Sequence, residues 1–163
     1  MERTIIDELI SCPKTVKVSP KRQMTTDARN NFTLRNDFSC VSEDGKIFEV
    51  FLRCNTRMPQ MFSIGLRYKS DQGTITICRY NGKHIHRNKI ADKNQFDNFH
   101  IHKIYDSQLA DTSASSMDAE PTAKYITFDE ALYAFLTDCN IVNWQEHFPN
   151  LEETVNQLRW EGV

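Results

Sequence analysis

The sequence predicts an α+β domain with a curved antiparallel sheet of about five strands, an N-terminal helix and two C-terminal helices. Apolar and polar residues alternate through the central part of the chain, which is typical of strands with one covered face. Turn sequences separate these runs, whereas apolar residues at both ends of the chain recur at helical spacing. A chain of 163 residues can bury a real core without disulfides, so we expect one domain over residues 1–163.

The first helix is predicted over residues 2–12, and Pro13 ends its pattern. Its apolar residues recur at helical spacing: Ile5, Ile6, Leu9 and Ile10. A polar, basic connector is expected at about residues 14–30. This part of the chain therefore predicts one short amphipathic helix that leads into the sheet.

Five strands are predicted after the connector, over residues 31–41, 47–54, 61–69, 74–80 and 99–105. In the second of them, alternate residues share an apolar face: Phe48, Val50, Leu52 and Cys54. Glu43-Asp44-Gly45-Lys46 and Ser70-Asp71-Gln72-Gly73 have turn composition, so neighbouring strands are expected to form a meander. Arg53, Arg67 and Arg79 fall on successive strands; they either line one sheet face together or belong to a merely solvated surface.

Residues 106–124 are small and polar, and we expect them to form a long mobile loop. Thr127 followed by Glu130 is a capping-box sequence, which predicts the start of a helix there. A similar start at Asn150-Leu151-Glu152-Glu153 predicts the last helix. The acidic residues in both first turns complement the helix dipoles.

The charge of the chain is unevenly distributed. Residues 1–103 carry 18 Lys and Arg against 11 Asp and Glu, whereas residues 104–163 carry 2 against 11. A basic sheet beside an acidic helical end indicates either a polyanion-binding face or two solvated faces that attract each other. The five cysteines are widely spaced and form no Cys-x-x-Cys pair, and the first residues are too polar for a signal or membrane segment. We therefore expect a cytoplasmic protein that does not act in a membrane.

Four of the five histidines fall within nineteen residues, as His84-Ile85-His86 and His100-Ile101-His102. On a strand, each tripeptide directs two imidazoles to one face and its isoleucine to the other. We expect His100 and His102 on the less apolar face, exposed or lining a cleft. The Asn81-Gly82 turn signal is expected to reverse the chain and bring His84 within about 12 Å of them.

Three interpretations of this histidine cluster stay open. The four imidazoles of His84, His86, His100 and His102 can bind one divalent metal, zinc or manganese, because side chains two apart on a strand lie roughly 6.5–7 Å from each other. Alternatively, they act without a metal as general acid and base on RNA, with an arginine to stabilise the phosphorane. In the third interpretation they are polar strand residues without a special function.

The order of these residues resembles that of a known group of proteins. The motif consists of Arg79-Tyr80-Asn81-Gly82 with His84, then His100-Ile101-His102, then Cys139-Asn140-Ile141. It resembles an uncharacterised domain family of bacterial and phage proteins and, more distantly, the TumE-type toxins of toxin–antitoxin systems. The resemblance to these toxins implies one set of catalytic residues: Arg79, Tyr80, Asn81, His84, His100 and His102.

Two classes of function follow as expectations. The first is a small bacterial, phage or mobile-element protein with a histidine-centred site, either a toxin-like ribonuclease or a binder of a phosphate-bearing ligand such as RNA. The second is a non-catalytic interaction module that binds an antitoxin or a host factor. Histidines that converge in one cleft favour the first class, and histidines spread over separate surfaces favour the second.

Overall fold

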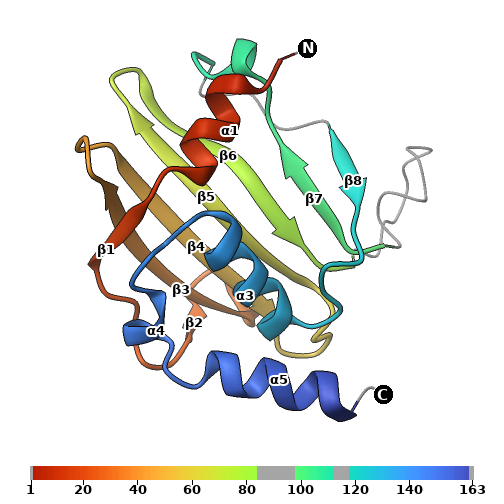
Figure 1. The fold of residues 1–163 in the computed structure, drawn as a ribbon. Helices are drawn as coiled ribbons and strands as arrows, with labels where there is room; N and C mark the ends of the chain where they lie inside the picture. The colour runs from red at the N-terminus through yellow and green to blue at the C-terminus, as the bar shows by residue number, and fades with distance from the viewer. Residues whose placement is uncertain (1, 84–97, 112–117, 162–163) are drawn as a thin grey trace, which may run out of the picture.

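The computed structural model describes residues 2–83, 98–111 and 118–161 and contains eight strands, four α-helices and one 3₁₀ turn in those ranges (Figure 1). The elements follow in the order α1 (Thr4–Ser11), β1 (Lys14–Val18), β2 (Thr25–Asp27), β3 (Asn30–Ser42), β4 (Ile47–Asn55), β5 (Phe62–Ser70), β6 (Gly73–Asn81), β7 (His100–Lys103), η1 (Asp106–Gln108), β8 (Ala119–Pro121), α3 (Phe128–Asp138), α4 (Trp144–His147) and α5 (Leu151–Glu161). The predicted α+β class is thus confirmed, but three helices, α3, α4 and α5, follow the sheet where two were predicted.

All the strands belong to one antiparallel sheet with the order β1-β3-β4-β5-β6-β7-β8, and β2 pairs with β3 beside this path. The sheet is not closed, since β1 and β8 lie at its two ends. The five predicted strands are present as β3 to β7, but the predicted number of about five strands is wrong. Strands β1, β2 and β8 are additional.

The additional strands pair with longer neighbours, which explains why their own sequences did not predict them. Strand β3 has 13 residues, and its two halves pair with β2 and β1 respectively. The predicted basic connector at 14–30 therefore contains two strands. Likewise, the predicted loop at 106–124 contains η1 and β8, and β8 pairs with β7. A partner strand supplies hydrogen bonds to such short polar segments, whatever their own propensity.

Helices α1 and α3 lie across the same face of the sheet (Figure 1). Ile6, Leu9 and Ile10 of α1 share one apolar core with Leu132 and Phe135 of α3. The inward-facing strand residues complete this core: Phe38, Cys40, Phe48, Val50, Leu52, Phe62, Ile64, Leu66, Ile75, Ile77, Cys78 and Tyr80. We call this side the helix-covered face. We call the opposite side the open face, because no helix of the described ranges lies on it.

A buried lysine joins the helices to the sheet. The Lys14 side chain is 1% exposed, and its ammonium donates hydrogen bonds to the carbonyl oxygens of Ile10, Cys12 and Cys139 at 2.7, 2.9 and 2.9 Å. Two of these carbonyls end α1, and the third ends α3. Unpaired carbonyls at a helix C-terminus attract a cation, so Lys14 serves as a cap for both helices.

Two of the remaining sequence expectations concern cysteines and membrane segments. All five cysteines have free thiols. Within the described ranges, none of the helices has the length and apolar character needed to span a bilayer.

Candidate functional site

The pairing of β6 with β7 assembles part of the predicted site. Arg79 lies opposite His102 and Asn81 lies opposite His100, so these four side chains share the open face. Ile101 pairs with Tyr80 and faces the other way. The predicted alternation of the His100-Ile101-His102 tripeptide is therefore present, and the two imidazole centroids lie 4.8 Å apart.

The two histidines are buried, although exposed or cleft-lining side chains were expected. His100 is 0% exposed and His102 is 9% exposed. His100 Nδ1 donates to the carbonyl oxygen of Asn98 at 2.8 Å, and its Nε2 lies 3.5 Å from Asn81 Nδ2, which can only donate. Asn81 in turn accepts a hydrogen bond from Ser63 Oγ at 2.7 Å. This chain of contacts fixes a neutral His100, whose two ring nitrogens are both engaged.

The charge state of His100 follows from its surroundings. Burial lowers the pKa of His100 below its ordinary value of 6.5, and the nearby Arg79 guanidinium lowers it further. The hydrogen bond to Asn98 opposes this shift. A histidine that stays neutral and uses both ring nitrogens within the protein serves the structure rather than acid–base catalysis.

Arg79 has a different environment. Its side chain is half-buried, and burial alone lowers its pKa below the ordinary 12.5. Among the residues that the structure describes, no carboxylate lies within 4.0 Å of its guanidinium. Gly65 of β5 pairs with Arg79 of β6. The ring of Phe51 lies over Gly65, in the place that a Cβ atom would take. In the strand register, Arg79 therefore lies between Gly65, which the Phe51 ring covers, and His102.

A row of arginines extends this site across the open face. Arg67 lies over the Phe51 ring with Cζ 4.4 Å from its centroid, and Arg53 lies over the same ring at 5.5 Å. Arg35 is directly opposite Arg53 in the pairing of β3 with β4. We call these four residues, Arg35, Arg53, Arg67 and Arg79, the arginine row. Of the two alternatives for these arginines, the register thus supports a shared sheet face.

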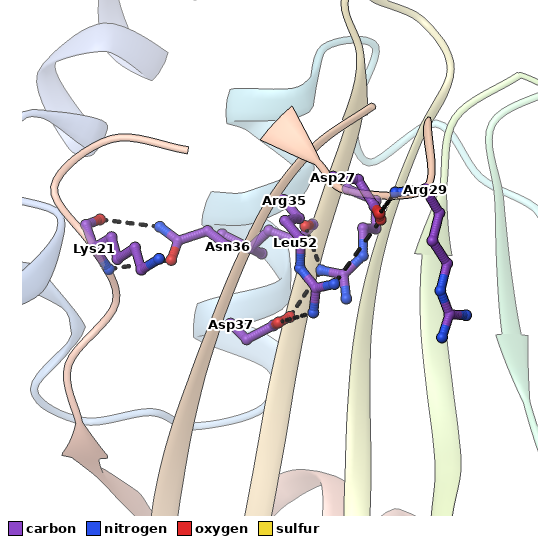
Figure 2. Close-up of polar contacts among 8 residues, drawn as sticks. Lys21, Asp27, Arg29, Arg35, Asn36, Asp37 and Leu52 are labelled. Carbon is purple, nitrogen blue, oxygen red and sulfur yellow. Dashed lines mark hydrogen bonds and ion pairs between the residues drawn. The ribbon is translucent and has the colours of Figure 1, made fainter. Parts of the chain in front are cut away.

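Only one half of the arginine row is neutralised by a carboxylate. Asp37 accepts a hydrogen bond from Arg35 at 2.6 Å (Figure 2). It also accepts one from Arg53 at 2.7 Å. Burial of the Asp37 carboxyl opposes its ionisation, but the hydrogen bonds from Arg53 and Arg35 prevail and lower its pKa. At the other half, neither Arg67 nor Arg79 has a carboxylate within 4.0 Å in the described part of the chain.

Tyr80 does not join the predicted site. It lies on the helix-covered face, stacks on Tyr125 with centroids 5.9 Å apart and donates a hydrogen bond to Asp138 of α3. Burial raises the pKa of its hydroxyl. Tyr80 is adjacent in sequence to Arg79 and Asn81, but strand alternation sends it to the core.

The metal interpretation depends on residues outside the described ranges. His84 and His86 belong to residues 84–97, so the predicted approach of His84 to the other histidines falls there too. In the parts of the chain that are described, no group of three or more His, Cys, Asp or Glu side chains is arranged to hold a metal ion. His100 and His102 alone supply two imidazoles.

The sequence interpretation missed Phe51 and Gly65. Phe51 follows Val50 and precedes Leu52, so alternation places it on the polar face of β4, where an aromatic residue is unexpected. Gly65 interrupts an apolar strand, which signals a close approach of another group. The two signals together, one strand apart, would have indicated an aromatic ring on the open face.

Comparison with known proteins places the chain in a family. A family of unknown function, DUF6978, matches residues 1–141, which include the arginine row, His100, His102 and α3. Helices α4 and α5 lie beyond the matched residues. Neither the curated proteins nor the solved structures contain a significant match. The chain therefore belongs to family DUF6978.

Proposed function

We propose that this protein binds single-stranded RNA through its phosphates, on the open face of the sheet. The observation that carries the proposal is the half-buried pair Arg67 and Arg79, which has no carboxylate within 4.0 Å in the described ranges. A guanidinium that has lost part of its hydration and has no counter-ion gains the most from an anionic ligand. Its planar donors match two phosphate oxygens at once.

The surface beside these arginines has room for a nucleic-acid chain. A groove of about 520 Å³ is lined by Arg35, Arg67 and Lys69, together with Asp37 and Glu49. Both acids of the groove are paired within the protein, Asp37 with two arginines and Glu49 with Lys69 at 2.8 Å. Because these ion pairs also engage Arg35 and Lys69, Arg67 is the lining cation of the groove that has no carboxylate within 4.0 Å in the described ranges. A phosphate chain can follow it toward Arg67 and then Arg79.

Binding is better supported than cleavage. General acid–base chemistry on RNA needs an imidazole that can take up and release a proton beside the substrate. His100 is fully buried and uses both ring nitrogens within the protein, so we assign it a structural role in this site. If the protein is a toxin-like ribonuclease, as the resemblance to the TumE-type toxins of bacterial toxin–antitoxin pairs implies, His102 and His84 are the better candidates for catalysis.

The cleavage proposal has a direct test. Purified protein is incubated with a labelled RNA, and His102→Ala is compared with wild type. Loss of about 10²–10⁴-fold in rate is expected for a catalytic histidine. Inhibition by a chelator that zinc or manganese reverses would assign a metal-dependent mechanism, whereas indifference to the chelator would assign free imidazoles. Absence of any cleavage by wild type would leave the protein as a binder.

A second candidate function, a non-catalytic interaction module, is favoured by one observation. Trp160 near the end of α5 is 83% exposed, and exposed tryptophans are frequent anchors of protein interfaces. This helix lies outside the residues that match the family. An antitoxin or host factor that docks on α5 would leave the open face free for RNA.

The binding proposal is tested by fluorescence anisotropy with a labelled single-stranded RNA of about ten nucleotides. We expect Arg67→Gln and Arg79→Gln each to weaken binding and together to reduce the slope of log affinity against log salt by about 1.4, since each phosphate contact contributes about 0.7. Arg159→Gln is the matched control, because Arg159 is an exposed arginine on α5. The proposal fails if wild type does not bind, or if Arg159→Gln weakens binding as much as the two sheet variants.

A further inference from the structure

A separate cavity of about 300 Å³ lies among β3, β4, α3, α5 and the segment at residues 21–24. Its wall of chain 21–24 is held in place by buried Asn36, which accepts a hydrogen bond from the Lys21 amide at 3.1 Å and donates one to the Lys21 carbonyl at 3.0 Å (Figure 2). Leu52, Leu132 and Leu151 are buried residues that line the cavity. The cavity is thus apolar on its inner side and does not belong to the arginine row.

One carboxylate in this cavity lies at the positive end of the α3 dipole but has no side-chain partner within the described ranges. Asp129, in the first turn of α3, accepts no hydrogen bond from a side chain there and has no cation within 4.0 Å. The helix does not need it as a cap, because Thr127 Oγ1 accepts the hydrogen bond from the Glu130 amide at 3.1 Å. Burial raises the pKa of Asp129, as expected for a carboxyl that faces apolar side chains without a counter-ion.

The same cavity carries cations at its rim. Lys21 and Arg22 line it and are exposed, and His147 of α4 lines it as well. Neither Lys21 nor Arg22 forms an ion pair with Asp129. The two cations and the carboxylate therefore line separate parts of the cavity. A ligand with a positive charge, a negative charge and an apolar group can therefore contact the carboxylate, the cations and the apolar lining at the same time.

We propose that this cavity binds a free α-amino acid with an apolar side chain, such as leucine. Asp129 receives the ammonium group, and Lys21 and Arg22 receive the carboxylate. The side chain packs on the partly exposed apolar residues of the lining, which are Met24, Phe128 and Phe148. Ligand pockets in proteins start at about 300 Å³, which suits a ligand of this small size. The proposal is independent of RNA binding, because it uses the other face of the sheet and other residues.

Isothermal titration calorimetry with three related probes tests each contact. We expect wild type to bind L-leucine, and to bind N-acetyl-L-leucine and L-leucinamide at least about tenfold more weakly, because each lacks one of the two charges. Asp129→Asn should weaken leucine binding by a similar factor. Asp7→Asn should not, since Asp7 also lies in the first turn of a helix, α1, but is exposed and does not line the cavity.

Two results would overturn the proposal. The first is the absence of binding for leucine and for larger apolar amino acids, measured on wild type whose thermal unfolding shows it to be folded. The second is N-acetyl-L-leucine binding as tightly as leucine, because the ammonium would then make no contact with Asp129. The double variant Lys21→Gln, Arg22→Gln checks the other end of the ligand: it should weaken the binding of leucine but leave that of leucinamide unchanged.

Discussion

Buried and half-buried cations on the two faces of the sheet differ in their hydrogen-bond and ion-pair partners. On the helix-covered face, Lys14 is almost fully buried and all three of its N–H groups meet backbone carbonyls. On the open face, Arg79 is half-buried and no carboxylate lies within 4.0 Å in the described ranges. A cation with every bond made inside the protein stabilises the fold, whereas one without a counter-ion is suited to a ligand.

His100 shows that the position on a face does not decide the role. It lies on the open face beside Arg79, but Asn98 and Asn81 engage both of its nitrogens. Because its polar atoms find partners within the protein, His100 resembles Lys14 and stabilises the fold. The hydrogen-bond partners, and not the residue type, therefore separate structural from functional side chains here.

The largest effect is expected from Lys14→Met. Methionine leaves three buried carbonyls at two helix ends without a donor, so the free energy of unfolding should fall by about 3 kcal/mol or more. Urea unfolding measures this loss. Lys17→Met on the same strand is the control, since Lys17 is exposed, and should change stability by less than about 0.5 kcal/mol. Equal losses for both variants would remove the distinction between the faces.

The second effect concerns packing on the open face. A Cβ atom at Gly65 would lie 2.1 Å from two atoms of the Phe51 ring, so Gly65→Ala should cost about 2 kcal/mol by displacing the ring. The displaced ring also carries Arg67, so RNA binding should weaken. In a Phe51→Ala background the same glycine change should cost much less. If the cost is the same in both backgrounds, the ring is not what requires glycine.

The third prediction uses pH to test the structural role of His100. Its folded-state pKa is lowered by burial, so the unfolded chain takes up a proton at higher pH than the native protein does. Stability from this group is therefore complete above about pH 6.5 and is lost as pH falls toward its folded pKa. The loss is at most about 1.4 kcal/mol per pH unit.

Denaturant unfolding between about pH 7 and about pH 5 measures this dependence. His100→Gln should flatten the slope, because it removes the imidazole that its surroundings hold neutral. A slope that stays the same in His100→Gln would show that His100 is not held neutral by its surroundings.

The smallest expected effect on stability is that of Arg79→Gln. A half-buried charge without a counter-ion does not stabilise the native state, so its removal should leave the free energy of unfolding unchanged or raise it by up to about 1 kcal/mol. Thermal and urea unfolding of the variant measure this. A loss of more than about 1.5 kcal/mol would instead make Arg79 a structural residue like Lys14.

The sequence predicted the parts of the fold that depend on local pattern. The alternation of β4, the N-cap at Thr127 and the helical spacing of α1 are all present. Strands β1, β2 and β8 were missed because their formation depends on hydrogen bonds from a partner strand and not on an alternating pattern of their own.

The sequence predicted only part of the site, because only part of it depends on the local pattern. Alternation placed His100 and His102 together, but it could not show that they are buried or that Asn98 and Asn81 engage His100. Tyr80 was grouped with Arg79 because the two are adjacent in the sequence, although adjacent strand residues face opposite sides. Burial and hydrogen-bond partners arise from the tertiary structure, and these decide which residues are free to act.

The most direct test of RNA binding on the open face is a nuclear magnetic resonance titration that follows the Nε–Hε signals of individual arginines as a short single-stranded RNA is added. The signals of Arg67 and Arg79 should shift together and saturate with one affinity, because both guanidinium groups contact phosphates. The signal of Arg159 on α5 should stay in place. Shifts confined to Arg159, or no shifts at any RNA concentration, would contradict RNA binding on the open face.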